Sequence, residues 1–297
     1  LLTISCIIEN FNKVAGIALN LLLLYLISKY SRSSLGTYKY LLIVFASSDV
    51  LLTIVHGCVN HQIVSVGSTF ASVACTFIES RNITAIYCAS FTLVFLLSIF
   101  NFLYRFWAVK HPHLVQLFAK KWFVALLVIV AASTFFSWYA LCVMGATGDI
   151  DEIGTIVARE EYRRRFGITL TDGFLVLDHW RDGKFNLRAA LVLLACDTTI
   201  ISCISFVVIF AFLCFNHIRK TDKLSEQTRR LQSKLLVTLC AQTAVPIAFV
   251  FIPYFAVNNL PFFDIDGHDI NVCCTALISL FPTCDAMVII WLMNDYR

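Results

Sequence analysis

Charged residues are scarce in this sequence. Asp, Glu, Lys and Arg make up 14% of the 297 residues, whereas apolar residues make up 59%. An ordinary soluble domain has about 25% charged residues, and the mean hydropathy here is +0.79. A soluble fold of this length needs far more polar surface than these residues supply. The composition therefore excludes a soluble enzyme, a disordered regulator and a nucleic-acid-binding domain.

The apolar residues are gathered in seven long runs. A helix needs about 20 mostly apolar residues to cross the hydrocarbon core of a membrane. The runs are too continuous for the alternating strands of a membrane β-barrel. We therefore predict an all-α membrane protein, in which the whole chain forms a single seven-transmembrane helix bundle. The predicted spans are residues 3–28, 39–60, 82–104, 122–144, 189–216, 235–257 and 271–293.

Basic residues are nearly missing from two of the loops. Loops 61–81 and 258–270 hold one Lys or Arg between them, whereas loops 29–40, 105–121 and 217–234 hold 13. Cytoplasmic loops are enriched in Lys and Arg, so we predict the N-terminus outside and the C-terminus inside. The remaining long loop has seven basic and eight acidic residues, which does not reverse this assignment.

Several signals of other protein classes are also missing. No basic region precedes the first apolar run, so a signal peptide is not evident, and we interpret the sequence as a trimmed domain. Polar landmarks show no internal repeat, which argues against a transporter built from duplicated halves. There is no His-Glu-x-x-His run and no recognisable serine nucleophile motif. The remaining enzymatic interpretation is a proteolytic dyad of Asp49 and Asp285.

Polar side chains within the predicted spans are costly in a membrane and are candidates for function. Asp49 and His56 share one face of the second span, because residues seven apart lie two helical turns apart. Asp285 lies about two turns from the end of the seventh span, and Asn20 lies in the first. Two interpretations of Asp49 and Asp285 stay open, a structural hydrogen-bond network and a role in conformational switching. His56 is either an interior histidine or a ligand contact.

The sixth span carries Gln242, Pro246, Phe249 and Pro253 on one helix face. Each proline removes a backbone hydrogen bond and bends the helix. We interpret the proline pair as a hinge, although such bends also serve packing.

The outer halves of the spans combine aromatic residues with a few polar ones, which suits a pocket for a small organic ligand. Asp197 fits either this pocket or the outer headgroup region. The candidate ligand-binding residues are His56, Glu79, Tyr87, Phe91, Asp197, Phe249 and Tyr254.

A second set of residues is predicted to switch or to face the cytoplasm. Its basic members also fit an attraction to anionic lipids without any protein partner. The set comprises Asn20, Asp49, Tyr104, Arg105, Arg229, Arg230, Lys234, Pro246, Pro253 and Asp285.

Four stretches of the sequence form an ordered set of motifs. They are Gly36-Thr37-Tyr38-Lys39-Tyr40 through Asp49; Tyr104-Arg105-Phe106 with Lys110-His111-Pro112; Leu236, Leu239, Gln242, Pro246 and Pro253; and Pro282, Asp285 and Tyr296-Arg297. Together they resemble one family, the nematode seven-transmembrane chemoreceptors of the Str group, within the rhodopsin-like receptor superfamily. The motifs occur in the family's order, and the resemblance covers nearly the whole chain.

The resemblance implies an odorant or other small-molecule receptor that activates a heterotrimeric G protein, with no metal or other cofactor. It also implies a multi-pass protein of the plasma membrane, in the sensory cilium of chemosensory neurons. In the superfamily, the arginine matching Arg105 holds the inactive state and later meets the G protein. Asn20 and Asp49 resemble the family's polar pair on the first two helices, and Asp285 resembles the acid or amide of its seventh helix.

The sequence departs from the superfamily pattern in three places. Tyr104 replaces the acid that usually precedes the arginine, and Ala286 stands where a proline usually follows Asp285. Loop 145–188 has no cysteine, so the usual disulfide from the third helix cannot form. That loop must then be held by packing and charge pairs, and residues 160–165 form either a short amphipathic helix over the mouth or a solvated charged face. The partners left open for Cys75 are Cys6, Cys142 and Cys273.

Two other functions remain open on the same fold. A neuropeptide receptor would use an accessible mouth with an acidic rim, for which Asp264, Asp266 and Asp269 are available. A transporter or channel would line a substrate path with the polar residues of the spans.

Overall fold

The computed structural model describes most of the chain. The described residues are 2–30, 38–75, 79–146, 152–170, 172–181, 184–220, 225–265 and 267–293. Gly36 and Thr37 before the second helix, and Tyr296 and Arg297 at the end, lie outside them. Asp266 also lies outside, and the side chains of Cys6 and Asp269 are not described.

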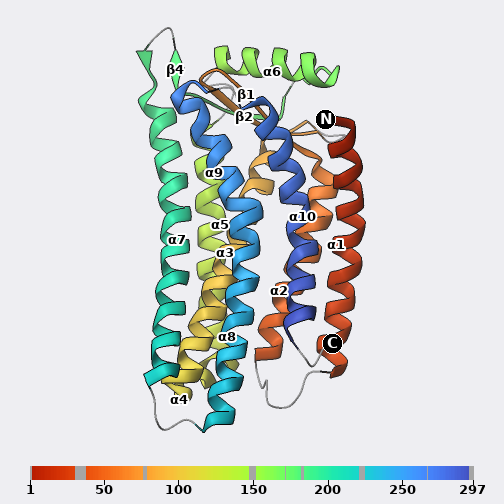
Figure 1. Ribbon diagram of the computed structural model, residues 1–297. Coiled ribbons are helices and arrows are strands. Elements are labelled where there is room, and N and C mark those ends of the chain that lie inside the picture. The colour runs from red at the N-terminus through yellow and green to blue at the C-terminus, as the bar shows by residue number, and fades with distance from the viewer. Residues whose placement is uncertain are drawn as a thin grey trace.

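Seven helices in the described part of the chain are long and apolar enough to cross a membrane (Figure 1). Lipid offers no hydrogen bonds to the backbone, so the apolar runs satisfy their own N–H and C=O groups by forming helices. The predicted seven-helix membrane fold is confirmed. The seven spans are α1 (Leu2–Tyr30), α2 (Tyr38–Val59), α3 (Arg81–Lys110), α5 (Lys121–Gly145), α7 (Leu187–Lys220), the composite span 226–263, and α10 (His268–Leu292).

The sixth span is not one uniform helix. It consists of α8 (Glu226–Pro246), a π-helical turn η3 (Ile247–Phe251), α9 (Ile252–Asn259) and a 3₁₀ turn η4 (Leu260–Phe263). Both prolines of the predicted hinge border this π turn, and they are the first residue before it and the second residue after it. A π turn inserts one extra residue per turn and often occurs at functional sites.

One end of the bundle carries a small sheet that the sequence did not reveal. Strand β2 (Thr69–Ala74) lies between β1 (His61–Val66) and β3 (Phe174–Asp178), and both pairings are antiparallel. Helix α6 (Glu152–Phe166) lies over the sheet, and a hairpin of β4 (Trp180–Arg181) and β5 (Lys184–Phe185) lies beside it (Figure 1). We call this end the sheet end, and the opposite end the Arg105 end. Helix α1 begins at the sheet end, and α10 ends toward the Arg105 end.

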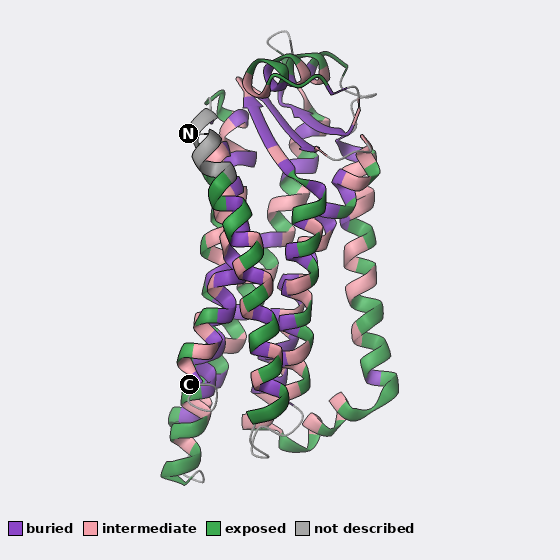
Figure 2. Ribbon diagram, turned by 90° about the vertical axis from the view of Figure 1, so that its right-hand side faces the viewer, coloured by how far each residue is buried: buried purple, intermediate pink, exposed green. Residues whose placement is uncertain are grey.

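The two faces of the sheet pack against different partners. Successive side chains of a strand point to opposite faces. Val64, Val73 and Val176 contact α6 residues, whereas Ile63 and Leu175 join the core of the helix bundle. The sheet is therefore a buried layer between α6 and the bundle, as the strands beneath α6 in Figure 2 show.

Packing and charge pairs hold α6 in place, as the sequence predicted for this loop. The ring of Tyr162 is buried against Phe174 of β3. Glu161 accepts hydrogen bonds from Arg164 and Arg165, and Arg165 also donates to the Ser65 carbonyl of β1. Burial raises the pKa of Glu161, but the two arginines outweigh burial and hold that pKa below its ordinary value.

The helices differ in how far they are buried. In the most apolar window of α3, 56% of the residues are buried, whereas the corresponding share of α5 is 6%. Figure 2 shows this uneven distribution of buried and exposed residues along the bundle. The sixth span and α10 share the 56% value of α3. Helix α3 contacts α2, α5, α7 and α8.

Candidate functional site

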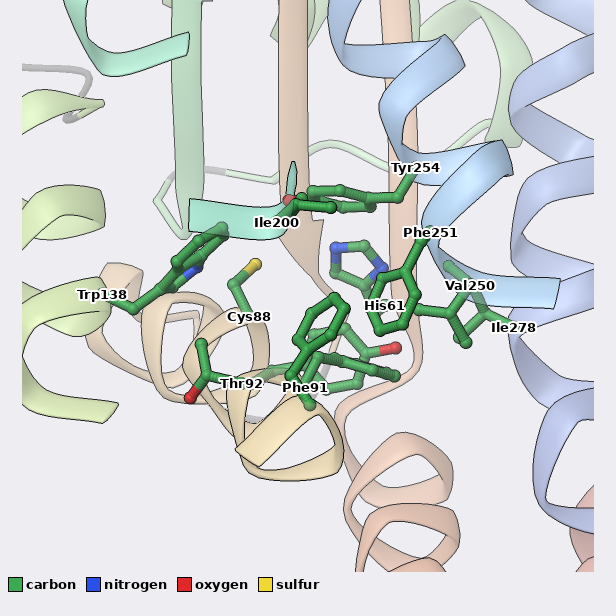
Figure 3. A pocket seen from close by; sticks show the side chains of 12 residues that line it. His61, Cys88, Phe91, Thr92, Trp138, Ile200, Val250, Phe251, Tyr254 and Ile278 are labelled. Carbon is green, nitrogen blue, oxygen red and sulfur yellow. The ribbon is translucent and has the colours of Figure 1, made fainter. Parts of the chain in front are cut away.

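An apolar pocket lies in the sheet half of the bundle. It holds a cavity of about 30 Å³, and its wall combines residues of β1, α3, α5, α7, η3, α9 and α10 (Figure 3). The wall is mainly aromatic, with Phe91, Phe95, Trp138 and Phe251 among its residues. A mainly aromatic lining with few polar groups suits a small organic ligand.

Three of the seven predicted ligand-binding residues line this pocket. Tyr87 and Phe91 belong to α3, and Tyr254 belongs to α9. Figure 3 labels Phe91 and Tyr254 among the residues of the wall. Tyr87 is fully buried and packs edge to face on Phe91, with 5.2 Å between the ring centroids. The residues of α3 one turn apart thus form one continuous aromatic wall.

His56 lies behind the wall rather than in it. Its Nδ1 atom and the Tyr87 hydroxyl are 2.7 Å apart, so the two side chains are hydrogen-bonded. His56 is buried on α2. It therefore fixes the orientation of a pocket residue from the neighbouring helix.

Three predicted residues lie outside the pocket wall. Asp197 of α7 accepts a hydrogen bond from the Asn259 amide of α9, at 3.4 Å. Glu79 accepts a hydrogen bond from the Asp172 backbone N–H, so it ties the start of α3 to the loop before β3. Phe249 packs against the core but does not line the pocket.

The π turn explains the displacement of Phe249. A regular helix places residues 242, 246, 249 and 253 on one face, as the spacing of these residues predicts. The extra residue in the π turn rotates the later part of the span relative to the earlier part. Val250, Phe251 and Tyr254 consequently form the wall of the pocket.

His61 is a pocket residue that sequence reasoning missed. It lies on the bundle face of β1, is 1% exposed, and stacks on Tyr87 with 4.4 Å between the ring centroids. The signal was the pair Gly67-Ser68 between two runs rich in β-branched residues, which is typical of a two-residue hairpin. Gly67 has φ +51°, as such hairpin turns require of their first residue.

No disulfide links the sheet end among the cysteines whose side chains the structure describes. Cys75, Cys142 and Cys273 are free thiols. The Cys75 sulfur lies 3.0 Å from the Tyr162 hydroxyl, and burial raises the pKa of this thiol. Pairing of β3 with β2 holds the long loop where the usual disulfide is missing.

A buried polar cluster lies between the pocket and the Arg105 end. Asp49 and Asp285 are 0% exposed, and their carboxyl groups are neighbours. The Gln242 amide donates to Asp285 at 3.3 Å, and the Asn20 amide donates to the carbonyl oxygen of Pro282 at 2.9 Å. The predicted polar residues of α1, α2, α8 and α10 are thus brought together.

Arg105 is buried at its end of α3 and contacts an aromatic ring. Its guanidinium carbon lies 3.8 Å from the ring centroid of Tyr38, and one of its nitrogens lies 3.5 Å from the Gln232 side-chain oxygen of α8. Tyr104 packs beside Tyr38, with 5.6 Å between the ring centroids. Position 104 carries no carboxylate, and the guanidinium of Arg105 contacts the ring of Tyr38 instead.

The predicted basic residues lie at the Arg105 end of α8. Arg230 forms an exposed ion pair with Glu226 one turn before it. Lys234 is exposed, whereas Arg229 is half-buried. Arg230 and Lys234 are therefore accessible from solvent, and the exposed ion pair of Arg230 contributes little to stability.

The described residues contain no group of three or more His, Cys, Asp or Glu side chains arranged to hold a metal ion. The pocket wall carries no charged side chain among its lining residues. The arrangement in the described part of the chain is therefore an apolar pocket next to a buried polar cluster.

Comparison with known proteins identifies the family of this chain. The family model described as serpentine type 7TM GPCR chemoreceptor Str matches residues 5–297. The chain is 23% identical to G-protein coupled receptor str-33 of Caenorhabditis elegans, an alignment that covers 99% of this chain and 89% of the relative. It is 25% identical to serpentine receptor class r-10 of Caenorhabditis briggsae, over 94% of this chain and 84% of the relative.

The match extends over nearly all of the seven-helix bundle, including the π turn and the sheet. The relatives are receptors and not enzymes, which excludes a proteolytic role for Asp49 and Asp285. The chain belongs to the Str family of serpentine-type seven-transmembrane GPCR chemoreceptors.

Proposed function

We propose that this receptor binds a small organic ligand, such as an odorant, in the pocket of the sheet half and thereby activates a heterotrimeric G protein at the Arg105 end. The observation that carries the proposal is the aromatic pocket itself, which joins five of the seven spans to the sheet. A ligand shifts a conformational equilibrium only through different affinities for the two states. A pocket built from so many elements is sensitive to their relative movement.

The route from the pocket to the Arg105 end runs along the sixth span. Phe251 of the π turn stacks on Phe95 of α3, with 3.4 Å between the ring centroids. In α8, which leads from the π turn to the Arg105 end, Gln242 donates a hydrogen bond to Asp285, and Gln232 approaches Arg105. A pivot of the span near Pro246 would therefore move all three contacts together and open a site for the G protein.

The proposed orientation places the sheet end outside the cell and the Arg105 end in the cytoplasm. The basic residues of the loops and of early α8 support it, because positively charged loops stay inside. We further propose that the receptor resides in the plasma membrane of the sensory cilium. Epitope tags at the two termini, detected with and without permeabilisation, test the orientation.

A small ligand accounts for the sheet end better than a peptide. The mouth of the bundle is covered by the three-stranded sheet and α6 (Figure 1), and a peptide receptor needs an open mouth. Among the three acids considered for a peptide-binding rim, the side chain of Asp264 is described, and it is exposed. A channel or transporter has no observation in its favour beyond the buried polar residues.

The test is a ligand screen in cells that express the receptor, with a calcium or cyclic-nucleotide readout. Arg105→Ala should abolish the response without reducing the amount of receptor at the surface, because the variant lacks the group that meets the G protein. The matched control is Arg163→Ala, which removes an exposed arginine of α6 paired with Glu160. Wild-type signalling by Arg105→Ala, or activation by peptide extracts alone, would overturn the proposal.

A further inference from the structure

His61 is held firmly in the pocket wall by one of its two ring nitrogens. Its Nε2 atom lies 2.6 Å from the Ser72 hydroxyl of the neighbouring strand β2. The ring is also stacked on Tyr87. Figure 3 shows it projecting among the pocket residues from the strand. The position and tilt of the imidazole are therefore set by the sheet and by α3 together.

The other ring nitrogen of His61 is unused. Its Nδ1 atom is buried and has no hydrogen-bond partner among the described residues. The indole Nε1 of Trp138, on the α5 side of the pocket, is likewise buried without a partner in the described part of the chain. Buried polar groups are normally paired, and each exception calls for an explanation.

Neighbouring hydroxyl groups in the wall are already engaged. The Tyr87 hydroxyl is hydrogen-bonded to His56, and the Thr92 hydroxyl donates to the Ala89 carbonyl. Most of the wall around them is aromatic or aliphatic. The Tyr254 hydroxyl and the Cys88 thiol, which also line the pocket, are hydrogen-bonded to each other. His61 Nδ1 and Trp138 Nε1 are thus polar atoms of the wall that have no partner among the described residues.

The two atoms restrict what that molecule can be. An indole N–H only donates, whereas an imidazole Nδ1 donates or accepts according to its tautomer. The molecule must therefore offer an acceptor. A charged molecule would lose its hydration in a pocket whose lining residues carry no charge to pair with it.

We infer that His61 and Trp138 are the hydrogen-bonding contacts of the ligand, and that the ligand is a small, uncharged, mainly apolar molecule with an acceptor oxygen, such as an aldehyde or ketone. The inference rests on the proposed function, because it specifies the chemistry of the same pocket. It assigns a recognition role to a strand of the sheet end, outside the seven membrane helices.

The experiment measures binding directly, without a G protein. Purified receptor in lipid nanodiscs is unfolded by heat while a thiol-reactive dye reports the exposure of buried cysteines. A ligand that binds the native state raises the unfolding midpoint. Two series are compared: hexanal, hexane, hexylamine and hexanoate, and benzaldehyde, toluene, benzylamine and benzoate. The aldehyde of at least one series should bind best.

Variants of His61 separate the hydrogen bond from packing. His61→Phe should reduce the preference for the aldehyde over the hydrocarbon about 3- to 10-fold, the usual net effect of one hydrogen bond. His61→Asn places an amide near the Nδ1 position and should retain most of the preference. The side-chain amide of His61→Gln reaches the Nε2 position and keeps the bond to Ser72. This variant should therefore lose the preference for the aldehyde.

Two further variants complete the design. Trp138→Phe should weaken the aldehyde preference in the same way. The control His179→Phe removes a buried histidine beside Phe262, away from the pocket, and should leave the preference unchanged. Binding of the hydrocarbon shows that each variant is folded. If His61→Phe does not fold, the difference in aldehyde preference between His61→Asn and His61→Gln tests the inference.

The inference is overturned if no aldehyde stabilises the wild type, if an amine or carboxylate binds better, or if His61→Gln keeps the full aldehyde preference. These failures differ from failure of the proposed function. A receptor that binds aldehydes through His61 but never activates a G protein contradicts only the proposed function. A receptor that signals with unchanged preference in the His61 variants contradicts only the inference.

Discussion

The sheet end and the Arg105 end of this receptor are held together in different ways. At the sheet end, backbone hydrogen bonds between three strands join loops that are about 100 residues apart in sequence, and α6 covers the result. At the Arg105 end, the corresponding ties are single side-chain contacts, of which the approach of Arg105 to Tyr38 and Gln232 is the central one.

The difference teaches how binding and switching are divided. A paired sheet yields only if several hydrogen bonds break together, so it keeps the pocket wall in one geometry. A cation over an aromatic ring contributes about 0.5–2 kcal/mol, which a ligand's differential binding can overcome. The proposed function thus places recognition at the end held by backbone pairing and movement at the end held by single side-chain contacts. Three predictions test this division.

The largest effect on stability is expected at the sheet end. A Cβ atom at Gly145 would lie 2.5 Å from a methyl carbon of Val192, which is buried on α7. Gly145→Ala should therefore lower the free energy of unfolding by about 1–3 kcal/mol, the usual cost of overpacking. Thermal unfolding of purified receptor measures it. The double variant Gly145→Ala with Val192→Ala should recover part of the loss, and no loss in the single variant would contradict the close packing.

A smaller change in stability with a larger change in activity is expected at the Arg105 end. Tyr38→Ala removes the ring beneath the Arg105 guanidinium and should raise ligand-independent G-protein activation by about 2- to 30-fold, from the range given for cation–π contacts. Tyr38→Phe keeps the ring and should stay near the wild type. The measurement is signalling in the absence of ligand. Equal signalling by Tyr38→Ala and Tyr38→Phe would contradict the idea that the ring of Tyr38 restrains Arg105.

The smallest effect concerns α6 and depends on pH. The pKa of Glu161 lies below its ordinary value because Arg164 and Arg165 favour the carboxylate. The sign follows from that direction: the stabilisation is complete above about pH 4.3, the ordinary value for Glu, and it is lost as the pH falls through the lower folded value.

Hydrogen exchange of α6 amides, corrected for the intrinsic effect of pH, should therefore accelerate in acid in the wild type. Glu161→Gln should exchange faster at neutral pH and show less dependence on pH. Glu160→Gln, which alters an exposed pair with Arg163, is the control. Acid-dependent exchange that persists in Glu161→Gln would assign the effect to another group.

The helical part of the fold can be predicted from the sequence because lipid allows few alternatives. Seven apolar runs can only become helices, and the polar residues within them turn inward. Asn20, Asp49, Gln242 and Asp285 were accordingly predicted as interior groups, and the structure brings them together. Their role in switching stays a prediction.

The candidate pocket was predicted only in part. Tyr87, Phe91 and Tyr254 can be predicted from helical periodicity, but Phe249 cannot, because a π turn changes that periodicity within the span. His61 was missed because strands outside the membrane are short and depend on pairing with distant segments. Position 61 pairs with Ala74 only once the chain has turned back at Gly67.

The hairpin also bears on how receptors of this architecture diversify. His61 lies on a strand and not on a membrane helix. A substitution there changes the wall of the pocket without changing any residue of the seven membrane helices. Under the proposed function, ligand preference can therefore change through β1 while the sequence of the helices stays the same.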